Sequence, residues 1–235
     1  MDKKDLRIIY MGTPEFAVAP LKALVDNGFN IVAVVTGEDK PQGRGRTIKP
    51  TPVKELAVSL GIPVLQPAKL KDENFQAELR SYNADLQVVV AFRMLPEAVW
   101  AMPKFGTFNL HTAILPQYRG AAPINWAVIN GETKTGVTTF MLDHDIDTGR
   151  ILLKKEIDIL PDDNAGSVHD KLMEVGADLV VKTVEMILSG NVKTIPQSEL
   201  IKPGTILKPA PKIFKEDCRW IFQKTASLSK ILFVV

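Results

Sequence analysis

Two polar residues, Asn109 and His111, are the first candidates for chemistry in this sequence. They lie at the end of residues 107–110, which predict a short strand, and side chains two apart on a strand leave the same face. An amide donor beside a titratable imidazole could stabilise an oxyanion and move a proton. The alternative is structural, with the Asn making a turn and the His bonded to backbone. Spacing alone favours that alternative.

An acidic turn at residues 143–149 is the second candidate. Asp143, Asp145 and Asp147 lie in it, followed by Thr148 and Gly149. The three carboxylates could bind a metal ion or orient a histidine, although they do not fit an EF-hand loop. Because Asp and Gly are common in turns, turn formation alone is the favoured interpretation of this segment.

A long basic connection at residues 36–54 is the third candidate. It has a local excess of positive charge, from Lys40, Arg44, Arg46, Lys49 and Lys54 against Glu38 and Asp39. Connections in α/β proteins are usually about 2–6 residues, so a projecting loop of this length suggests a function. Phosphate contact is the natural use of its cations. A solvated loop with incidental charge is an alternative of equal weight.

Several common sites are absent from the sequence. There is no P-loop, no HExxH zinc motif and no G-x-S-x-G nucleophile motif. The first predicted strand–helix turn, Gly12-Thr13-Pro14, lacks the glycines of a dinucleotide fingerprint, as does Gly43-Arg44-Gly45. This argues against a nicotinamide cofactor.

The composition narrows the class of protein further. The chain has 29 Lys plus Arg against 27 Asp plus Glu, a net charge of +2, which does not indicate a globally basic nucleic-acid binder. A single cysteine, Cys218, excludes an intrachain disulfide and a multi-cysteine metal site. No apolar run is long enough for a signal sequence or a membrane span. We therefore expect a cytoplasmic protein without a membrane partner.

The elements that would position these residues alternate between strand and helix. Apolar residues at 6–11, helical spacing at 16–25 and a β-branched run at 31–35 predict a βαβ unit and a parallel sheet. Thr13 is the expected N-cap of the first helix, with Pro14 as its first residue. The pattern continues with helices at 53–60, 73–81 and 124–129, strands at 63–65, 86–91 and 107–110, and a strand pair at 137–142 and 151–159. The expected fold class is α/β, a Rossmann-like, open, mostly parallel sheet with helices on both faces.

The last part of the chain contains a long predicted helix and then a segment rich in proline and lysine. A long helix is predicted to begin at Ser167, which resembles a capping box with Asp170, and to end at residues 189–190. From residue 196, prolines and lysines predict an extended linker. We divide the chain into a main domain at 1–195, a linker at 196–219 and a tail at 220–235.

Several motifs, in order, resemble those of the methionyl-tRNA formyltransferases. They are Met11-Gly12-Thr13-Pro14-Glu15-Phe16-Ala17-Val18, Asn109-Leu110-His111, Tyr118-Arg119-Gly120-Ala121-Ala122-Pro123-Ile124, Gly131-Glu132, Gly136-Val137-Thr138 and Asp147-Thr148-Gly149. The match runs in register from about residue 6 to residue 219. The resemblance implies a formyltransferase fold and a metal-free reaction. In that reaction, 10-formyltetrahydrofolate gives its formyl group to the α-amine of methionyl initiator tRNA, for translation initiation.

The resemblance also implies roles for particular residues. The family's catalytic Asn, His and Asp fall on Asn109, His111 and Asp147, so residues 1–195 would be the catalytic domain. Asn109 and protonated His111 would donate hydrogen bonds to an oxyanion, and Asp147 would stabilise the charged imidazole and help take up the amine proton. Folate would lie in a cleft that is partly lined by backbone and is formed by two segments, Phe92-Arg93-Met94-Leu95 and Ala113-Ile114-Leu115-Pro116. The acceptor stem of the tRNA would meet Arg44, Arg46 and Lys49.

Two alternatives accompany this interpretation. Formyltransferases that act on amino-sugar nucleotides share the Asn–His–Asp core but lack the basic loop, and a folate-binding module without turnover is the alternative outside enzymes. The family continues into a C-terminal β-barrel domain, whereas this sequence departs from the family after about residue 219. We interpret residues 220–235 as an aberrant or truncated tail, produced by a reading-frame change. We expect a monomer with reduced activity.

Overall fold

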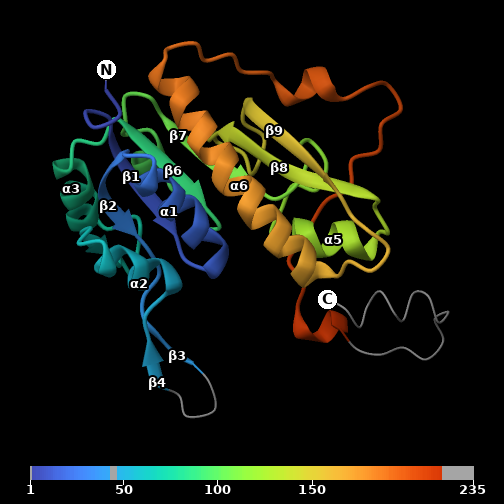
Figure 1. Cartoon of the computed structure of the whole chain (residues 1–235), viewed down its shortest axis with the longest axis horizontal. Coiled ribbons are helices and arrows are strands. Elements are labelled where there is room, and N and C mark those ends of the chain that lie inside the picture. Colours follow the sequence, from blue (N-terminus) through green and yellow to red (C-terminus); the bar gives the residue numbers. More distant parts are fainter. Residues whose placement is uncertain (1, 43–46, 219–235) are drawn as a thin grey trace.

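A seven-stranded sheet forms the centre of the protein, whose computed structural model describes residues 2–42 and 47–218 (Figure 1). The strand order is β5-β2-β1-β6-β7-β8-β9. The first five of these strands are parallel, and β8 and β9 are antiparallel to their neighbours. Their bounds are β1 (Arg7–Gly12), β2 (Asn30–Val35), β5 (Val64–Leu65), β6 (Leu86–Val90), β7 (Thr107–His111), β8 (Lys134–Met141) and β9 (Ile151–Asp158).

Helices cover both faces of the sheet. On one face lie α1 (Val18–Asp26), α2 (Pro52–Ser59) and the long α6 (Ala165–Leu188), and α5 (Pro123–Ile129) packs against α6 and β8. On the other face lie α3 (Glu73–Ser81) and α4 (Glu97–Trp100). The described residues also contain three short 3-10 turns: η1 (Glu15–Ala17), η2 (Gln197–Leu200) and η3 (Lys215–Cys218). The predicted α/β fold class is confirmed.

Alternating side chains of β1 enter two separate hydrophobic cores. Ile8 and Tyr10 pack with α1 and α6, while Ile9 and Met11 pack with α3 and α4. A strand buried on both faces is expected at the centre of a parallel sheet. The Tyr10 hydroxyl donates to the carbonyl of Ala17 at 2.6 Å, which fastens η1 to this strand, and burial raises the pKa of the phenol.

Two predicted helix starts are wrong. Thr13 does not cap the first helix, because Pro14 occupies the N-cap of η1 and the Thr13 hydroxyl instead accepts from the Gly37 N–H at 3.2 Å. The long helix begins before Ser167, at Ala165, and Asn164 is its N-cap. Ser167 still belongs to the capping box, as the residue whose hydroxyl accepts from the N-cap N–H at 2.9 Å.

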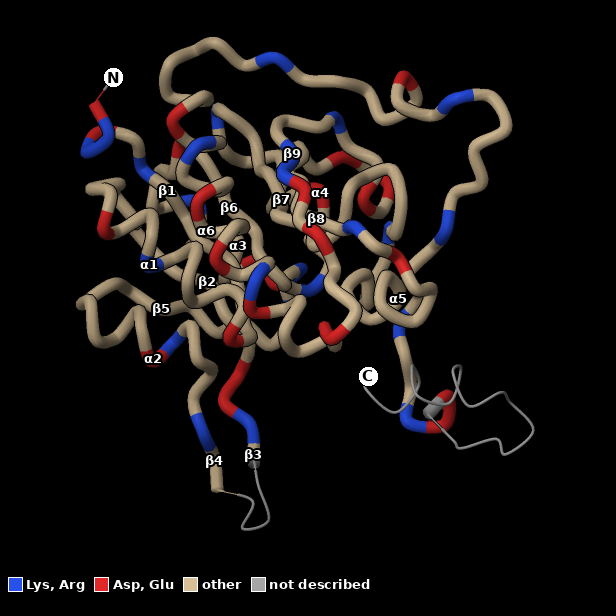
Figure 2. The backbone as a smooth tube through the Cα atoms, turned by 45° about the vertical axis from the view of Figure 1, so that its right-hand side comes forward, with Lys and Arg blue, Asp and Glu red and all other residues tan. Residues whose placement is uncertain are grey.

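The long basic connection is not an irregular loop throughout. It contains an antiparallel hairpin, β3 (Lys40–Gln42) and β4 (Thr47–Lys49), which stands away from the body of the protein (Figures 1 and 2). A buried hydrogen bond of 2.7 Å between the hydroxyls of Thr36 and Thr51 joins the two chain segments at its base. Helix α4 was not predicted.

The segment after α6 is extended, as predicted, but it lies against the domain. We call residues 194–211 the strap. Ile195 pairs with Ile151 through two hydrogen bonds of 2.9 Å, and η2 follows. Further on, the Tyr118 N–H donates to the Lys208 carbonyl at 2.7 Å, and the Ala210 N–H donates to the Arg119 carbonyl at 2.8 Å. The strap is thereby fixed at both ends. The division into domain, linker and tail stays a prediction, and the tail at 220–235 lies outside the described residues.

Candidate active site

The end of β7 carries Asn109 and His111 on one face of the sheet. Phe108 and Leu110, between and before them, enter the core beneath α6. The predicted common face is therefore confirmed. The carboxyl ends of β1, β6 and β7 lie side by side here, since Gly12 pairs with Val90 and Val90 with Leu110. In open parallel sheets, this edge is where ligands bind.

The Asn109 side chain is half-buried and has no hydrogen-bond partner within residues 2–42 and 47–218. An amide has two donors and an acceptor, and leaving them unpaired costs free energy unless water or a ligand satisfies them. The amide at the end of this strand is therefore available to a bound molecule.

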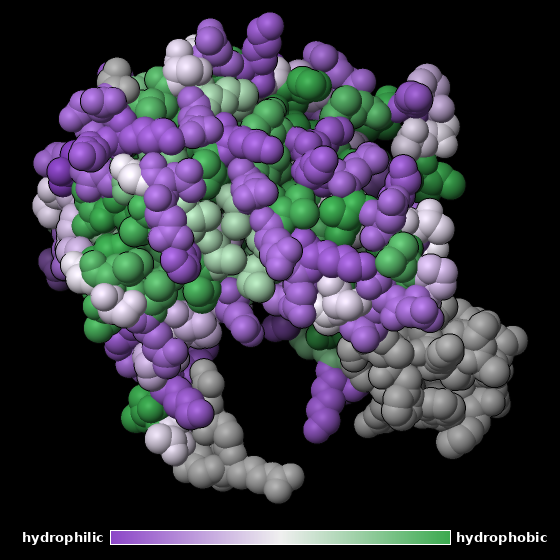
Figure 3. Space-filling view, viewed as in Figure 1, coloured by the Kyte–Doolittle hydropathy of each residue, from purple (hydrophilic) through white to green (hydrophobic). Residues whose placement is uncertain are grey.

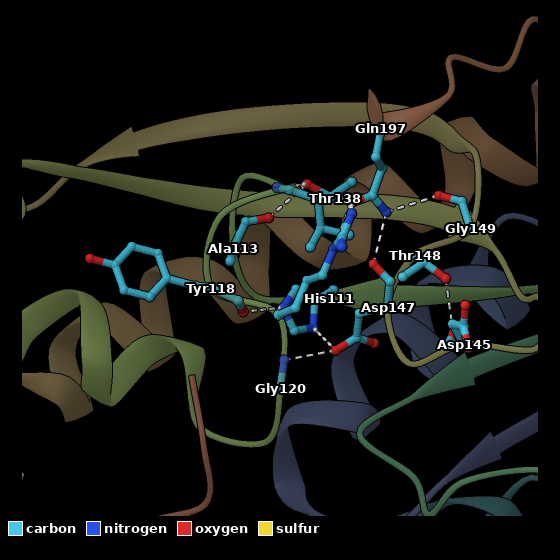
Figure 4. A network of polar contacts seen from close by, with 12 residues as sticks. His111, Ala113, Tyr118, Gly120, Thr138, Asp145, Asp147, Thr148, Gly149 and Gln197 are labelled. Carbon is cyan, nitrogen blue, oxygen red and sulfur yellow. Dashed lines mark hydrogen bonds and ion pairs between the residues drawn. The ribbon is translucent and has the colours of Figure 1, made fainter. Parts of the chain in front are cut away.

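His111 is only 6 % exposed, and protein groups face both of its ring nitrogens (Figure 4). Nε2 lies 2.8 Å from the carbonyl oxygen of Tyr118. Because a carbonyl can only accept, this contact assigns the proton to Nε2. Nδ1 is then the nitrogen that can gain and lose a proton, and it lies 3.8 Å from Oδ2 of Asp147. If His111 donates to a reacting oxygen, it must do so from Nδ1.

Asp147 reaches His111 from the acidic turn between β8 and β9. Its Oδ2 also accepts a hydrogen bond of 2.9 Å from the Gly120 N–H, and its backbone has a φ of 55°. Left-handed backbone is uncommon outside glycine, although Asp tolerates it better than most residues. The Asp147 carboxylate thus connects the acidic turn with the loop after β7.

The other acids of that turn are organised differently. Oδ1 of Asp143 accepts from the Thr148 hydroxyl at 2.8 Å and from the Asp145 N–H at 3.2 Å, so Asp143 stabilises the turn itself. Asp145 is exposed. In the described part of the chain, no three side chains of His, Cys, Asp or Glu gather as they would around a metal ion.

The two segments expected to line a folate site leave adjacent strands at this edge. Residues 92–95 follow β6, and their backbone groups form no hydrogen bond to the described part of the chain. In the segment after β7, Ala113 and Leu115 are buried, and the Thr138 hydroxyl donates to the Ala113 carbonyl at 2.6 Å and accepts from the Leu115 N–H at 3.2 Å. Ile114 is half-buried, and Pro116 follows through a cis peptide bond.

Side chains of the first segment differ in exposure. Met94 is 71 % exposed, Phe92 is half-buried and Leu95 is buried. The Arg93 guanidinium donates to the carbonyls of Pro67 and Ala68, so it is held by the chain rather than left free. The segment therefore offers unpaired backbone and apolar surface together.

Lysine side chains are exposed to solvent at the base of the β3–β4 hairpin. Lys40 and Lys49 are exposed and directly opposite each other on the two strands. Figure 3 shows hydrophilic side chains on this part of the surface together with hydrophobic ones, and Ile48 beside Lys49 is 68 % exposed. Lys54 is different, because it forms an ion pair of 2.6 Å with Asp39 that lowers the pKa of that carboxyl. Arg44 and Arg46 lie outside the described residues.

A cleft of about 340 Å³ lies between the first strand–helix turn and the hairpin base. Thr13, Glu15, Lys40 and Thr51 are among the residues that line it. It opens at the same edge of the sheet as the Asn109–His111 face, because Thr13 directly follows β1, but Asn109, His111 and Asp147 do not line it.

Sequence reasoning missed the polar residues that the strap brings to this site. Gln197 is 3 % exposed and contacts both the acidic turn and Arg119. Lys208 forms an ion pair of 2.6 Å with Glu132, whose pKa it lowers together with the Tyr118 hydroxyl. Burial and the bond to Glu132 raise the pKa of Tyr118. No periodicity marks these residues, since their segment is irregular and rich in proline.

Comparisons with known proteins show the family to which the chain belongs. The chain belongs to the formyl transferase family, which matches residues 6–184. Methionyl-tRNA formyltransferase from Phocaeicola vulgatus is 64% identical over 220 residues, covering 93% of this chain and 68% of that protein. The enzyme of the same name from Parabacteroides distasonis is 61% identical over 219 residues, with the same coverage. Within the family, the chain therefore belongs to the methionyl-tRNA formyltransferases.

A solved structure shares the fold at much lower identity. An N-formyltransferase from Helicobacter canadensis, solved with folinic acid and dTDP-3-aminofucose, superimposes with a TM-score of 0.68 at 20% identity. The alignment covers 100% of this chain and 80% of that one. No helix within the described ranges has both the length and the apolar character needed to cross a membrane.

Proposed function

We propose that this chain transfers the formyl group of 10-formyltetrahydrofolate to the α-amine of methionyl initiator tRNA, in the cytoplasm, as a step of translation initiation. The observation that supports the proposal is that Asp147 lies beside His111, which shares its strand end with Asn109, in a chain 61% identical over 219 residues to a methionyl-tRNA formyltransferase. The alternative acceptor, an amino-sugar nucleotide, is supported only by a fold shared at 20% identity.

The residues at the strand edge fit a folate. A reduced pteridine has a row of donors and acceptors, and the unpaired backbone groups of residues 92–95 can satisfy such a row. Ala113 and Leu115 are buried, so contacts in that segment come from the backbone and from Ile114. When bound, the donor supplies the formyl carbon that the amine attacks.

Residues of this chain would stabilise the negative charge on the formyl oxygen and transfer the protons of the reaction. The free Asn109 amide would donate to the formyl oxygen as negative charge develops on it. Nδ1 of His111 would carry a proton toward the same oxygen, because Nε2 is occupied by the Tyr118 carbonyl. The Asp147 carboxylate, 3.8 Å from Nδ1, would stabilise the imidazolium and help to take up the proton that the amine loses.

The hairpin is the proposed contact for the acceptor stem. Like charges opposite each other on a β-ladder repel, so the facing Lys40 and Lys49 are better accommodated beside an anion such as phosphate. Arg44 and Arg46, between the two strands in the sequence, would extend this cationic surface, and Lys49 would join them. A monomer would suffice, because all the proposed groups come from one chain.

Formylation of charged initiator tRNA by this chain, measured beside folate binding, tests the proposal. Asn109→Ala and His111→Ala should each lower turnover while urea unfolding stays cooperative. Arg44→Ala should weaken tRNA formylation and leave folate affinity nearly unchanged. Near-normal turnover in both site variants would refute the catalytic assignment. Folate binding without formylation of tRNA would favour a binding module, and formylation of an amino-sugar nucleotide would favour the other enzyme.

A further inference from the structure

The Gln197 amide is fully paired although it lies in an irregular segment. Its Nε2 donates to two carbonyl oxygens of the acidic turn, those of Asp147 at 2.8 Å and Gly149 at 2.9 Å. Its Oε1 accepts from the Arg119 guanidinium twice, at 3.0 Å from Nε and 2.6 Å from a terminal nitrogen. A buried side chain that uses both amide donors and both acceptor positions is strongly fixed in orientation.

This pairing also fixes which way the amide points. A flipped amide would set its NH2 group against a guanidinium and its oxygen against two carbonyls, so all four contacts would be lost. Figure 4 shows Gln197 descending from the strap onto the turn, with its nitrogen between Asp147 and Gly149. One side chain therefore holds the backbone on either side of Thr148.

The same amide holds the other side of the site through Arg119. Arg119 lies between Tyr118, whose carbonyl receives Nε2–H of His111, and Gly120, whose N–H donates to Asp147. Gln197 thus connects the loop that orients the imidazole with the turn that carries the carboxylate. The 3.8 Å separation of Nδ1 and Oδ2 depends on the relative position of these two segments.

We propose that Gln197 is a positioning residue, which clamps the Asp147 turn to the Tyr118–Gly120 loop and so sets the geometry between Asp147 and His111. The role rests on the proposed formyl transfer. Gln197 follows the family match, which ends at residue 184, and its hydrogen bonds go to Arg119, Asp147 and Gly149 rather than to the side chains of Asn109 or His111. Displacement of a reacting group by about 1 Å can cost on the order of 100-fold in rate, so a clamp of this kind affects kcat.

Two substitutions at this position separate the possible roles. Gln197→Met keeps the length of the side chain and removes its hydrogen bonds. Gln197→Glu keeps the acceptor for Arg119 but replaces the donor with an oxygen that faces two carbonyls. A residue that only anchors Arg119 would tolerate Glu, whereas a clamp on the Asp147 turn would not.

Arg150→Met is the matched control. The Arg150 side chain anchors the strap three residues away from Gln197, donating to the Thr194 hydroxyl at 2.6 Å and to the Thr194 carbonyl at 3.0 Å, and it is exposed. Arg150→Met removes the side-chain hydrogen bonds to Thr194 that hold the strap, but it removes no hydrogen bond to Asp147 or Arg119. Urea unfolding of each variant verifies that the chain still folds.

The kinetic test is formylation of methionyl-tRNA by the full chain. We expect both Gln197 variants to lower kcat about 10- to 100-fold with the KM for folate within twofold of wild type, and Arg150→Met to keep both constants within twofold. A kcat within twofold of wild type in Gln197→Glu overturns the clamp, as does an equal loss in Arg150→Met. If Gln197→Met does not fold, Gln197→Glu carries the comparison.

A spectroscopic test is independent of turnover. Imidazole 15N NMR of the wild-type chain should show His111 as the Nε2–H tautomer, which Gln197→Met should convert into a mixture while Arg150→Met leaves it unchanged. An unaltered His111 spectrum in both Gln197 variants overturns the positioning role. A changed spectrum in a chain that does not formylate tRNA supports the clamp and counts against the proposed function alone.

Discussion

Replacement of Asp147 by Asn isolates the charge of the carboxylate from its shape. The Asn oxygen can still accept from the Gly120 N–H, which lies 2.9 Å from the native Oδ2, so the turn should keep its position. What disappears is the negative charge 3.8 Å from Nδ1 of His111. The substitution therefore tests whether Asp147 stabilises a protonated imidazole during the reaction.

The size of the effect follows from that distance. Two unit charges about 4 Å apart interact by roughly 4 kcal/mol at an effective dielectric constant of about 20. The Asp147 side chain is 14% exposed and the Asn amide keeps a dipole, so we expect a loss of about 2–4 kcal/mol of transition-state stabilisation. Since about 1.4 kcal/mol is tenfold in rate, kcat should fall roughly 30- to 1,000-fold.

The assay is steady-state formylation of methionyl-tRNA, with folate affinity and urea unfolding measured on the same preparations. Asp145→Asn is the control, because Asp145 lies in the same turn with an exposed side chain that contacts neither His111 nor Gly120. Its kcat should stay within twofold of wild type. A kcat for Asp147→Asn within threefold of wild type would refute the charge argument, and an equal loss in Asp145→Asn would refute its assignment to one carboxylate.

Three further predictions concern stability and the shape of the site. Thr138→Val should lower the free energy of unfolding, measured in urea, by about 2–4 kcal/mol, because it leaves the buried Ala113 carbonyl and Leu115 N–H without the Thr138 hydroxyl. Thr135→Val is the control and should be nearly neutral, because the hydroxyl it removes forms no side-chain hydrogen bond. Gly149→Ala should cost about 1–3 kcal/mol and reduce kcat, because its Cβ would meet a backbone oxygen of β8; normal stability and turnover would contradict this. Hydrogen bonds from Lys171, the Leu160 N–H and the Ser167 hydroxyl lower the pKa of Asp163 to about 2, below its unfolded value of about 3.9. The stabilisation is therefore present above the unfolded value and is lost as pH falls through about 2. Between pH 5 and pH 2, the free energy of unfolding measured in urea should fall less for Asp163→Asn than for wild type. Equal falls in this free energy would contradict the assignment.

The parts of the site that depend on local spacing could be predicted from the sequence. Asn109 and His111 share a face because the period of a strand is two, and the apolar residues around them leave only one face polar. Helix starts were less accurate where two capping side chains compete. Asn164 and Ser167 can each cap a helix, and the reciprocal bonds between them, rather than either residue alone, set the first turn.

Contacts between distant segments could not be predicted in the same way. Asp147 reaches His111 because β8 pairs antiparallel with β7, and only the resemblance to a family suggested that the two residues meet. Gln197 is a polar residue among prolines, which is typical of solvated chain. Its burial depends on the Arg119 guanidinium and two carbonyls that come from other parts of the sequence.

The strap has a consequence for the order in which the chain is made. Arg119 leaves the ribosome 78 residues before Gln197, and all the strands of the central sheet are synthesised in between or earlier. A nascent chain that has released α6 can therefore assemble its sheet while the Asp147 turn still lacks its clamp. We expect the catalytic geometry to mature only after the strap emerges. The proposed activity would thus arise only after the chain segments that form the two cores around β1 have been released.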